Sequence, residues 1–160
     1  MNQMSVRSIV FQTMIASMYV VLVYIFQFMS FGPLQFRIAE VLLVIVFFDK
    51  KSIIGLTLGT FIANWLMSPF GLIDALFGSL ATLVALSLMI VFSKKLIISL
   101  SMPALANGLI IGAMIAYVEV IPFLPIFFWV FLGEWIVLFL LGLPLFHTLK
   151  NNKSFMEFFN

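Results

Sequence analysis

The sequence contains no cysteine and only one histidine. Without cysteine it can form no disulfide, no thiolate metal site and no thiol nucleophile. The lone His147 follows the last apolar segment, where we expect it to cap a helix C-terminus or lie at an interface. No HExxH, GxSxG or Walker motif is present. We therefore predict no catalysis, no metal and no cofactor, and any pumping must draw energy from a partner or an ion gradient.

Charged residues are scarce as well, at 9% of a chain that is 64% apolar and has a mean hydropathy of +1.27. Such a composition cannot coat a soluble core, so the lipid bilayer must be the solvent. The 160 residues have room for about six spans of about 20 residues each. A net charge of +2 with dispersed bases gives no indication of nucleic-acid binding. We predict one all-α transmembrane domain over residues 1–160.

Polar residues and Pro/Gly breaks divide the sequence into six apolar segments, which predict a six-helix transmembrane bundle. We interpret the first segment as a retained helix, because it is longer than a signal-peptide core and lacks a cleavage site. The predicted helices are Ile9–Phe31, Leu34–Phe48, Ser52–Leu66, Leu72–Phe92, Leu96–Ile121 and Phe123–Phe146.

The bases predict the orientation of this bundle. Short cytoplasmic loops of membrane proteins collect Lys and Arg, and all but one of the bases fall on the same predicted side. We therefore expect both termini in the cytoplasm and the protein in the cell membrane of a bacterium. The bases on the common side are Arg7, Lys50, Lys51, Lys94, Lys95, Lys150 and Lys153.

Arg37 is the base that breaks this pattern. The segment from Arg37 to Asp49 is about 12 residues long, roughly 18 Å as a helix, whereas a hydrocarbon core is about 30 Å thick. Arg37 must therefore lie at membrane depth, preceded by irregular backbone at residues 31–35 (FGPLQ). Irregular backbone is tolerated there only where protein or a watery cavity supplies hydrogen bonds. Such a stretch often lines a binding site.

Carboxylates also lie at or beyond the predicted mid-depth, away from the lysines: Glu40, Asp74, Glu119 and Glu134. Glu134 is about ten residues, roughly 15 Å, from the outer end of the last helix, and Glu40 is comparably deep. An ionised carboxylate in hydrocarbon is costly unless it is paired or hydrated. We predict that these carboxylates bind a ligand. Glu134 is the strongest candidate, because it has no neighbouring base and no capping role.

The other carboxylates have structural alternatives. Glu40 lies three residues from Arg37, and the two side chains can simply neutralise each other. Asp74 precedes a helical run and can cap it. Glu119 lies at the end of its span and can be solvated.

The amides of Asn64 and Asn107 add donors and acceptors at the same depth, either as bridges between helices or as ligand contacts. Arg37 and the four carboxylates sum to about −3 if all are ionised. We therefore expect a cavity that favours a cation or a donor-rich molecule, and we exclude an anionic substrate. Glu134 and Trp135 diverge by about 100° on a helix, so at most one of the two enters that cavity.

Small residues recur at every fourth position in two segments, which lets helices approach closely. We expect these faces to pack within one bundle, with a face for a partner protein as the alternative. Thr13, Ala16 and Ser17 form a similar, weaker stripe in the first segment. The two main stripes are Gly55, Gly59 and Ala63, and Ala104, Gly108, Gly112 and Ala116.

Three blocks of sequence are distinctive. Residues 32–40 read GPLQFRIAE, Asn64 is followed by Pro69, Gly71, Asp74 and FGSLAT at residues 77–82, and Gly133-Glu134 precedes GLP at residues 142–144. Together these blocks, which span nearly the whole chain, resemble the QueT family. Members of that family are substrate-binding S components of energy-coupling factor (ECF) transporters assigned to queuosine precursors.

The resemblance implies a six-helix S component that captures 7-aminomethyl-7-deazaguanine, or a related deazapurine, from outside. Its partners would be a transmembrane coupling subunit and two ATPase subunits, and it would topple in the membrane to deliver its load. A flat, cationic, donor-rich ligand suits the acidic cavity, and a chain without a nucleotide loop needs an external motor. The aminomethyl base, its nitrile precursor and queuine share the same deazaguanine face, so the residues do not choose among them.

On this hypothesis, Glu134 or Glu40 accepts the ring N–H and the exocyclic amine, and Asp74 or Glu119 faces the aminomethyl cation. The remaining hydrogen bonds would come from Gln35, Arg37, Asn64 and Asn107, with Arg37 on the ring carbonyl.

One departure from the family pattern concerns docking. S components commonly dock through an alanine-x-x-x-alanine stripe in the first helix, whereas here Val20 follows Ala16 four residues later. We assign the docking stripe to Thr13, Ala16 and Ser17. Two other readings stay open: an S component for another small cationic vitamin, or a solitary proton-coupled carrier with Glu134 as its relay.

Overall fold

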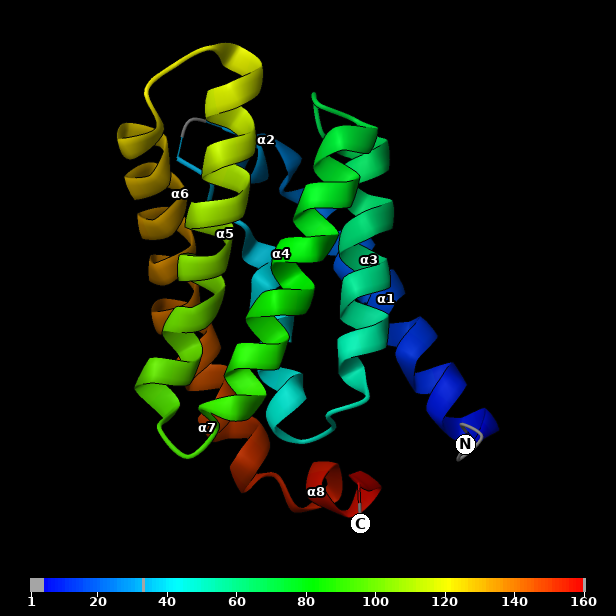
Figure 1. The fold of residues 1–160 in the computed structure, drawn as a ribbon. Coiled ribbons are helices and arrows are strands. Elements are labelled where there is room, and N and C mark those ends of the chain that lie inside the picture. Colours follow the sequence, from blue (N-terminus) through cyan, green and yellow to red (C-terminus); the bar gives the residue numbers. More distant parts are fainter. Residues whose placement is uncertain (1–4, 33, 160) are drawn as a thin grey trace.

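The computed structural model describes residues 5–32 and 34–159, and within them it shows helices and connecting turns but no strand (Figure 1). The predicted all-α class is confirmed. The helices, in chain order, are α1 (Val6–Ile25), α2 (Gln27–Ser30), the 3₁₀-helix η1 (Ile38–Phe47), α3 (Ser52–Met67), α4 (Leu72–Val91), α5 (Leu96–Glu119), α6 (Phe123–Val137), the π-helical turn η2 (Leu138–Gly142), α7 (Leu143–Asn151) and α8 (Lys153–Phe159).

Four stretches of the described chain are long and apolar enough to cross a membrane: Val6–Ile25, Leu72–Val91, Leu96–Glu119 and Phe123–Asn151. The other two predicted spans are shorter apolar helices, Ile38–Phe47 and Ser52–Met67. The number of helices that cross the bilayer therefore stays a prediction.

The short helix η1 lies at the centre of the bundle. Helices α1, α3, α4, α6 and α7 all contact it (Figure 1). Around it, α3 packs between α1 and α4, and α5 packs between α4 and α6. A helix that is apolar all round is a buried one, and residues 42–46 of η1 (LLVIV) are buried. A 3₁₀-helix rises about 2.0 Å per residue, so these ten residues reach further than an α-helix of the same length.

The structure corrects the boundaries of two predicted helices. The first one ends at Ile25, because Phe26 (φ −108°, ψ 25°) leaves the helical conformation before the short α2. The second begins at Ile38 instead of Leu34. The irregular backbone predicted before it is present over the described residues and extends through Arg37; Pro33 lies outside those residues.

The last helix is longer than predicted and continues through α7 to Asn151. The π-helical turn η2 comes directly before Pro144, which has no N–H to donate to the carbonyl of Leu140, and the wider turn absorbs this defect. His147 therefore lies within α7 rather than after the helix, with its ring 5.5 Å from that of Phe146. The predicted capping role for His147 is wrong.

The small-residue stripes pack inside the bundle, as predicted. A Cβ on Gly55 would lie 2.5 Å from the carbonyl oxygen of Gln12, and one on Gly59 would lie 3.0 Å from that of Ala16. These glycines therefore let α3 approach α1 closely. In α5, Gly108 and Gly112 make the same kind of contact with Phe127 of α6.

The predicted docking stripe is divided by the structure. Thr13 and Ser17 are exposed, and their hydroxyls donate to the carbonyls of Ile9 and Thr13 in their own helix. Ala16 is only 5% exposed and faces Gly59 of α3. Thr13 and Ser17, without Ala16, are thus open to a partner.

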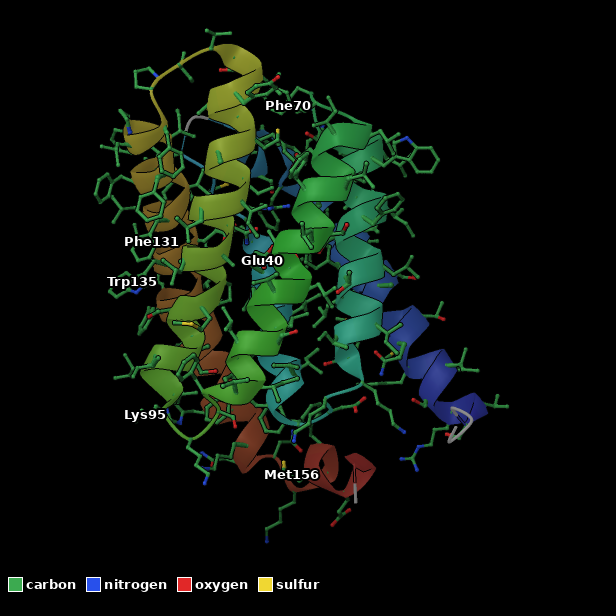
Figure 2. All side chains as sticks on the ribbon, viewed as in Figure 1. Glu40, Phe70, Lys95, Phe131, Trp135 and Met156 are labelled. Carbon is green, nitrogen blue, oxygen red and sulfur yellow. The ribbon has the colours of Figure 1, made fainter. Side chains whose placement is uncertain are left out.

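The predicted single-sided set of bases gathers at one end of the bundle, which we call the lysine end. The turns before α3 and α5 lie there, together with α8 and the start of α1, and Lys95 and Met156 mark it in Figure 2. Rings tie α8 to this end: Phe48 lies 5.4 Å from Phe155 and 5.5 Å from Phe146. Which side of the membrane this end faces remains a prediction.

Replacing Val120 by glycine should stabilise the protein. Val120 ends α5 with φ 55°, in the left-handed region, which is strained for a β-branched residue. It is 89% exposed, so glycine would relieve the strain with little loss of packing. We expect Val120→Gly to raise the free energy of unfolding by about 1 kcal/mol, measured by thermal unfolding in detergent. Val118→Gly, inside the same helix, should lower it. A fall for both variants would contradict the assignment of strain.

Candidate functional site

Arg37 lies at the centre of a buried group of polar side chains. It is 2% exposed, and its Nη2 donates to Asn64 Oδ1 at 2.9 Å. Its Nε lies 3.9 Å from Glu40 Oε1, and its Nη1 lies 3.8 Å from Glu134 Oε1. One guanidinium thus connects η1 with α3 and α6. Figure 2 shows Glu40 in the middle of the bundle.

A second ring of hydrogen bonds surrounds this centre. Asn107 Nδ2 of α5 donates to Glu134 Oε2 at 2.8 Å, and Tyr19 Oη of α1 donates to Glu40 Oε1 at 2.7 Å. Asn64 Nδ2 donates to the backbone oxygen of Asp74 in α4 at 3.2 Å. Every long helix therefore contributes. We call the set of Tyr19, Arg37, Glu40, Asn64, Asp74, Asn107 and Glu134 the polar cluster.

The polar cluster has more carboxylate than base, and some of its acceptors accept no hydrogen bond from the protein. Glu40 and Glu134 share one guanidinium, and all three groups are at most 2% exposed. Glu40 Oε2, Asn107 Oδ1 and Glu134 Oε1 are buried and have no hydrogen-bond partner. A buried acceptor left this way costs about 1–3 kcal/mol. Three such oxygens within the polar cluster make it a candidate site for a ligand that brings donors.

Two glycines give the polar cluster its room. A Cβ on Gly133 would collide with the backbone carbonyl of Gln35, so only glycine lets the irregular chain before Arg37 lie against α6. A Cβ on Gly78 would overlap the side-chain nitrogen of Asn64, which explains how that amide fits between α3 and α4. The backbone N–H of Phe36 donates to the carbonyl of Met29 at 3.0 Å, so this irregular stretch is hydrogen-bonded within the protein.

A cavity of about 420 Å³ lies at the end of the bundle opposite the lysines. Its lining includes Gln35, Phe70, Ile115, Glu119, Trp129 and Val130. Figure 2 shows Phe70 at this end. Gln35 is the predicted site residue that lies between the cavity and the polar cluster, because it lines the former and is two residues from Arg37.

The structure brings most of the predicted site residues together and separates one. Glu119 is exposed on the cavity and lies 12 positions after Asn107 in α5, roughly 18 Å along the axis. That separation is much longer than a purine ring. One ligand therefore cannot touch both, but Glu119 and Gln35 line the same cavity, and the prediction that Glu119 binds the ligand stays a prediction.

Two of the structural alternatives can be decided. The predicted Arg37–Glu40 pair is present, but Arg37 also lies near Glu134, so the two residues do not simply neutralise each other as an isolated pair. Asp74 is not the N-cap of α4; Gly71 takes that position, and Asp74 sits in the first turn beside Asn64. The prediction that only one of Glu134 and Trp135 turns inward is confirmed, because Glu134 is buried whereas Trp135 is 38% exposed on the outside (Figure 2).

Sequence reasoning missed Tyr19. The signal was available in the spacing of Gln12, Ala16 and Tyr19, which share one face of a helix, and all three are buried. A phenol on such a face needs a partner, but the sequence does not reveal that the partner is Glu40. Within the described residues, no group of His, Asp and Glu side chains is arranged to hold a metal ion.

Comparison with known proteins adds a family. A model described as QueT transporter matches residues 9–151. The chain is also 40% identical over 90 residues to the protein named Queuosine precursor transporter QueT from Lactococcus lactis subsp. cremoris (strain MG1363). That match covers 55% of this chain and 52% of the relative, so the similarity spans about half the length of the relative. No solved structure gives a significant match.

Adding one methyl group at Gly133 should disturb the site. Gly133→Ala forces the Gln35 carbonyl away from α6, and overpacking of this kind costs about 1–3 kcal/mol of stability. Gly142→Ala on the same helical stretch is the matched control, since its new Cβ would meet its nearest neighbour at an ordinary 3.4 Å. Thermal unfolding of both variants measures the difference. Equal stability would show that the Gln35 segment does not depend on Gly133.

Proposed function

The chain belongs to the QueT transporter family, and on that premise we propose that it binds a queuosine precursor in the polar cluster and carries it across a membrane. The family and the apolar helices together make it a multi-pass membrane protein. The relative from Lactococcus lactis is named for transport of a queuosine precursor. We extend that substrate class to this chain because the chemistry of the polar cluster suits it.

The observation that carries the proposal is the set of three acceptor oxygens without partners around Arg37. A deazaguanine edge presents donors on a ring nitrogen and an exocyclic amine, next to a carbonyl that accepts. Glu134 Oε1 and Glu40 Oε2 would take the donors, and Arg37 would donate to the carbonyl. Asn107 Oδ1 would accept the remaining hydrogen, because its Nδ2 is already used on Glu134.

The charge of the polar cluster favours the aminomethyl base over its nitrile precursor. The polar cluster holds three carboxylates, Glu40, Asp74 and Glu134, and one guanidinium, which leaves negative charge without a counterion when the carboxylates are ionised. A buried charge is costly unless it is paired. An ammonium group elsewhere on the ligand would offset this charge, whereas a nitrile would not. We therefore propose 7-aminomethyl-7-deazaguanine as the substrate.

The cavity at the opposite end from the lysines is the proposed entry. Ligand pockets commonly measure about 300–1,000 Å³, and this cavity of about 420 Å³ has aromatic walls for a flat ring. Glu119 at its lining would attract a cation before the base passes Gln35. Asn64 and Asp74 would hold Arg37 in place rather than touch the ligand.

The wider assembly follows from the same proposal. The chain would be one transmembrane domain over residues 1–160, with six helices across the cell membrane of a bacterium and both termini in the cytoplasm. It would serve as the S component of an ECF transporter, with a transmembrane coupling subunit and two ATPase subunits. The exposed Thr13 and Ser17 of α1 are the proposed docking residues. A chain without a nucleotide loop needs such a motor.

Removing the charge of Glu134 should abolish most of the affinity. We expect Glu134→Gln to weaken binding of 7-aminomethyl-7-deazaguanine by about 30–150-fold, because a buried hydrogen bond to a charged group contributes about 2–3 kcal/mol. Isothermal titration calorimetry on purified protein measures this. Glu157→Gln, on the exposed tail, is the matched control. Unchanged affinity in both Glu134→Gln and Glu40→Gln would sink the assignment of the polar cluster as the site.

Partner dependence separates the proposed S component from other transporters. Co-expression with ECF coupling and ATPase subunits should yield a stable complex, and uptake of the base by cells should require ATP hydrolysis by those subunits. Uptake that persists without the ATPases and collapses with the proton gradient would instead identify a solitary carrier. Tight binding of another cationic vitamin, with none of the deazapurine, would reassign the substrate.

A further inference from the structure

Tyr19 stands apart from the rest of α1. Most of this helix is exposed, yet Tyr19 is 0% exposed and its hydroxyl reaches Glu40 Oε1 at 2.7 Å. That distance is typical of a strong hydrogen bond from a hydroxyl to an ionised carboxylate. The proposed function assigns Tyr19 no contact with the substrate.

The position of Tyr19 is fixed by close packing. A Cβ on Gly59 would lie 3.0 Å from the Cβ of Tyr19, so α3 holds the base of this side chain. The backbone of Ala16, one turn earlier in α1, is held by the same glycine. With its Cβ against α3 and its side chain fully buried, Tyr19 directs its hydroxyl toward Glu40 of η1.

The hydrogen bond determines which oxygen of Glu40 stays available. Oε1 accepts from Tyr19 and faces Arg37 Nε at 3.9 Å, a distance too long for a hydrogen bond. Oε2 is buried and accepts nothing. An arginine and a carboxylate that are free to turn form a bidentate pair, which uses both oxygens. In this structure Oε1 instead accepts the hydrogen bond from Tyr19, and the bidentate pair is not formed.

We propose that Tyr19 is a positioning residue for the substrate site: it holds Glu40 back from Arg37 so that Oε2 can accept a hydrogen bond from the ligand. This inference rests on the proposed function. It adds α1 to the set of helices that determine the affinity, although α1 supplies no ligand contact.

The test is Tyr19→Phe, with Tyr24→Phe as the matched control, since Tyr24 is 66% exposed on the same helix. We expect Tyr19→Phe to weaken binding of 7-aminomethyl-7-deazaguanine roughly tenfold, equivalent to about 1.4 kcal/mol. The melting temperature of the protein without ligand should be unchanged or higher, because Glu40 can then close on Arg37. The control should leave both quantities unchanged.

A double-mutant cycle shows whether Tyr19 acts through Glu40. In a Glu40→Gln background, Tyr19→Phe should cost no further affinity. Additive losses of affinity would overturn the proposal, because Tyr19 would then not act through Glu40. A Tyr19→Phe variant that does not fold, or whose melting temperature falls together with its affinity, would also overturn it, because the hydroxyl would then have a merely structural role.

The melting temperatures of the protein without ligand also distinguish a failure of the proposed function from a failure of the proposed role of Tyr19. If the wild-type protein binds no deazapurine, the proposed function fails, and the positioning role of Tyr19 is then decided without ligand. In that case Tyr19→Phe must leave the melting temperature unchanged or higher, and Glu40→Gln must remove any gain. If the wild-type protein binds but Tyr19→Phe binds equally well, the function stands and the role of Tyr19 is rejected.

Discussion

A single buried guanidinium organises this bundle. Arg37 donates a hydrogen bond to Asn64 of α3 and lies beside carboxylates of η1 and α6, and each of these partners is itself held by another helix. Removing one member of a buried ionic group is strongly destabilising, because the remaining charges lose their counterion. The positions of six helices thus converge on one side chain. The polar cluster thus links the helices through polar contacts, beside the close approaches that the glycines of α3 and α5 allow.

Placing an arginine at this depth requires irregular backbone. The chain reaches Arg37 through residues 34–36, which form no helix and would expose polar groups to lipid elsewhere. Gly133 lets this irregular stretch pack against protein, since its missing side chain allows the Gln35 carbonyl to lie against α6. The same irregular stretch separates the cavity from the polar cluster. On the proposed function, the feature that makes room for Arg37 would therefore also control access to it.

The sequence predicts this centre better than it predicts its surroundings. Length arithmetic places Arg37 at membrane depth without any tertiary information, and the depth of Glu134 follows from helix rise alone. The distance between Asn107 and Glu119 also follows from their spacing of 12 residues in α5. The role of Tyr19 depends instead on which way α1 is rotated, and local spacing does not encode that rotation. The break at Phe26 has no Pro or Gly to mark it. Boundaries and rotations arise from packing, which a single sequence does not display.

The three acceptor oxygens that accept no hydrogen bond from the protein would determine which ligands the polar cluster selects. Each costs stability while it accepts no hydrogen bond, and a ligand that supplies a donor to each recovers that free energy as affinity. A ligand that lacks one donor leaves an oxygen buried and unpaired, and sites built around hydrogen bonds reject such analogues by large factors. The pocket walls, which are aromatic and apolar, discriminate weakly by comparison. On the proposed function, selectivity for the base would reside in Glu40, Asn107 and Glu134, and the hydroxyl of Tyr19 would contribute to it by keeping Glu40 available.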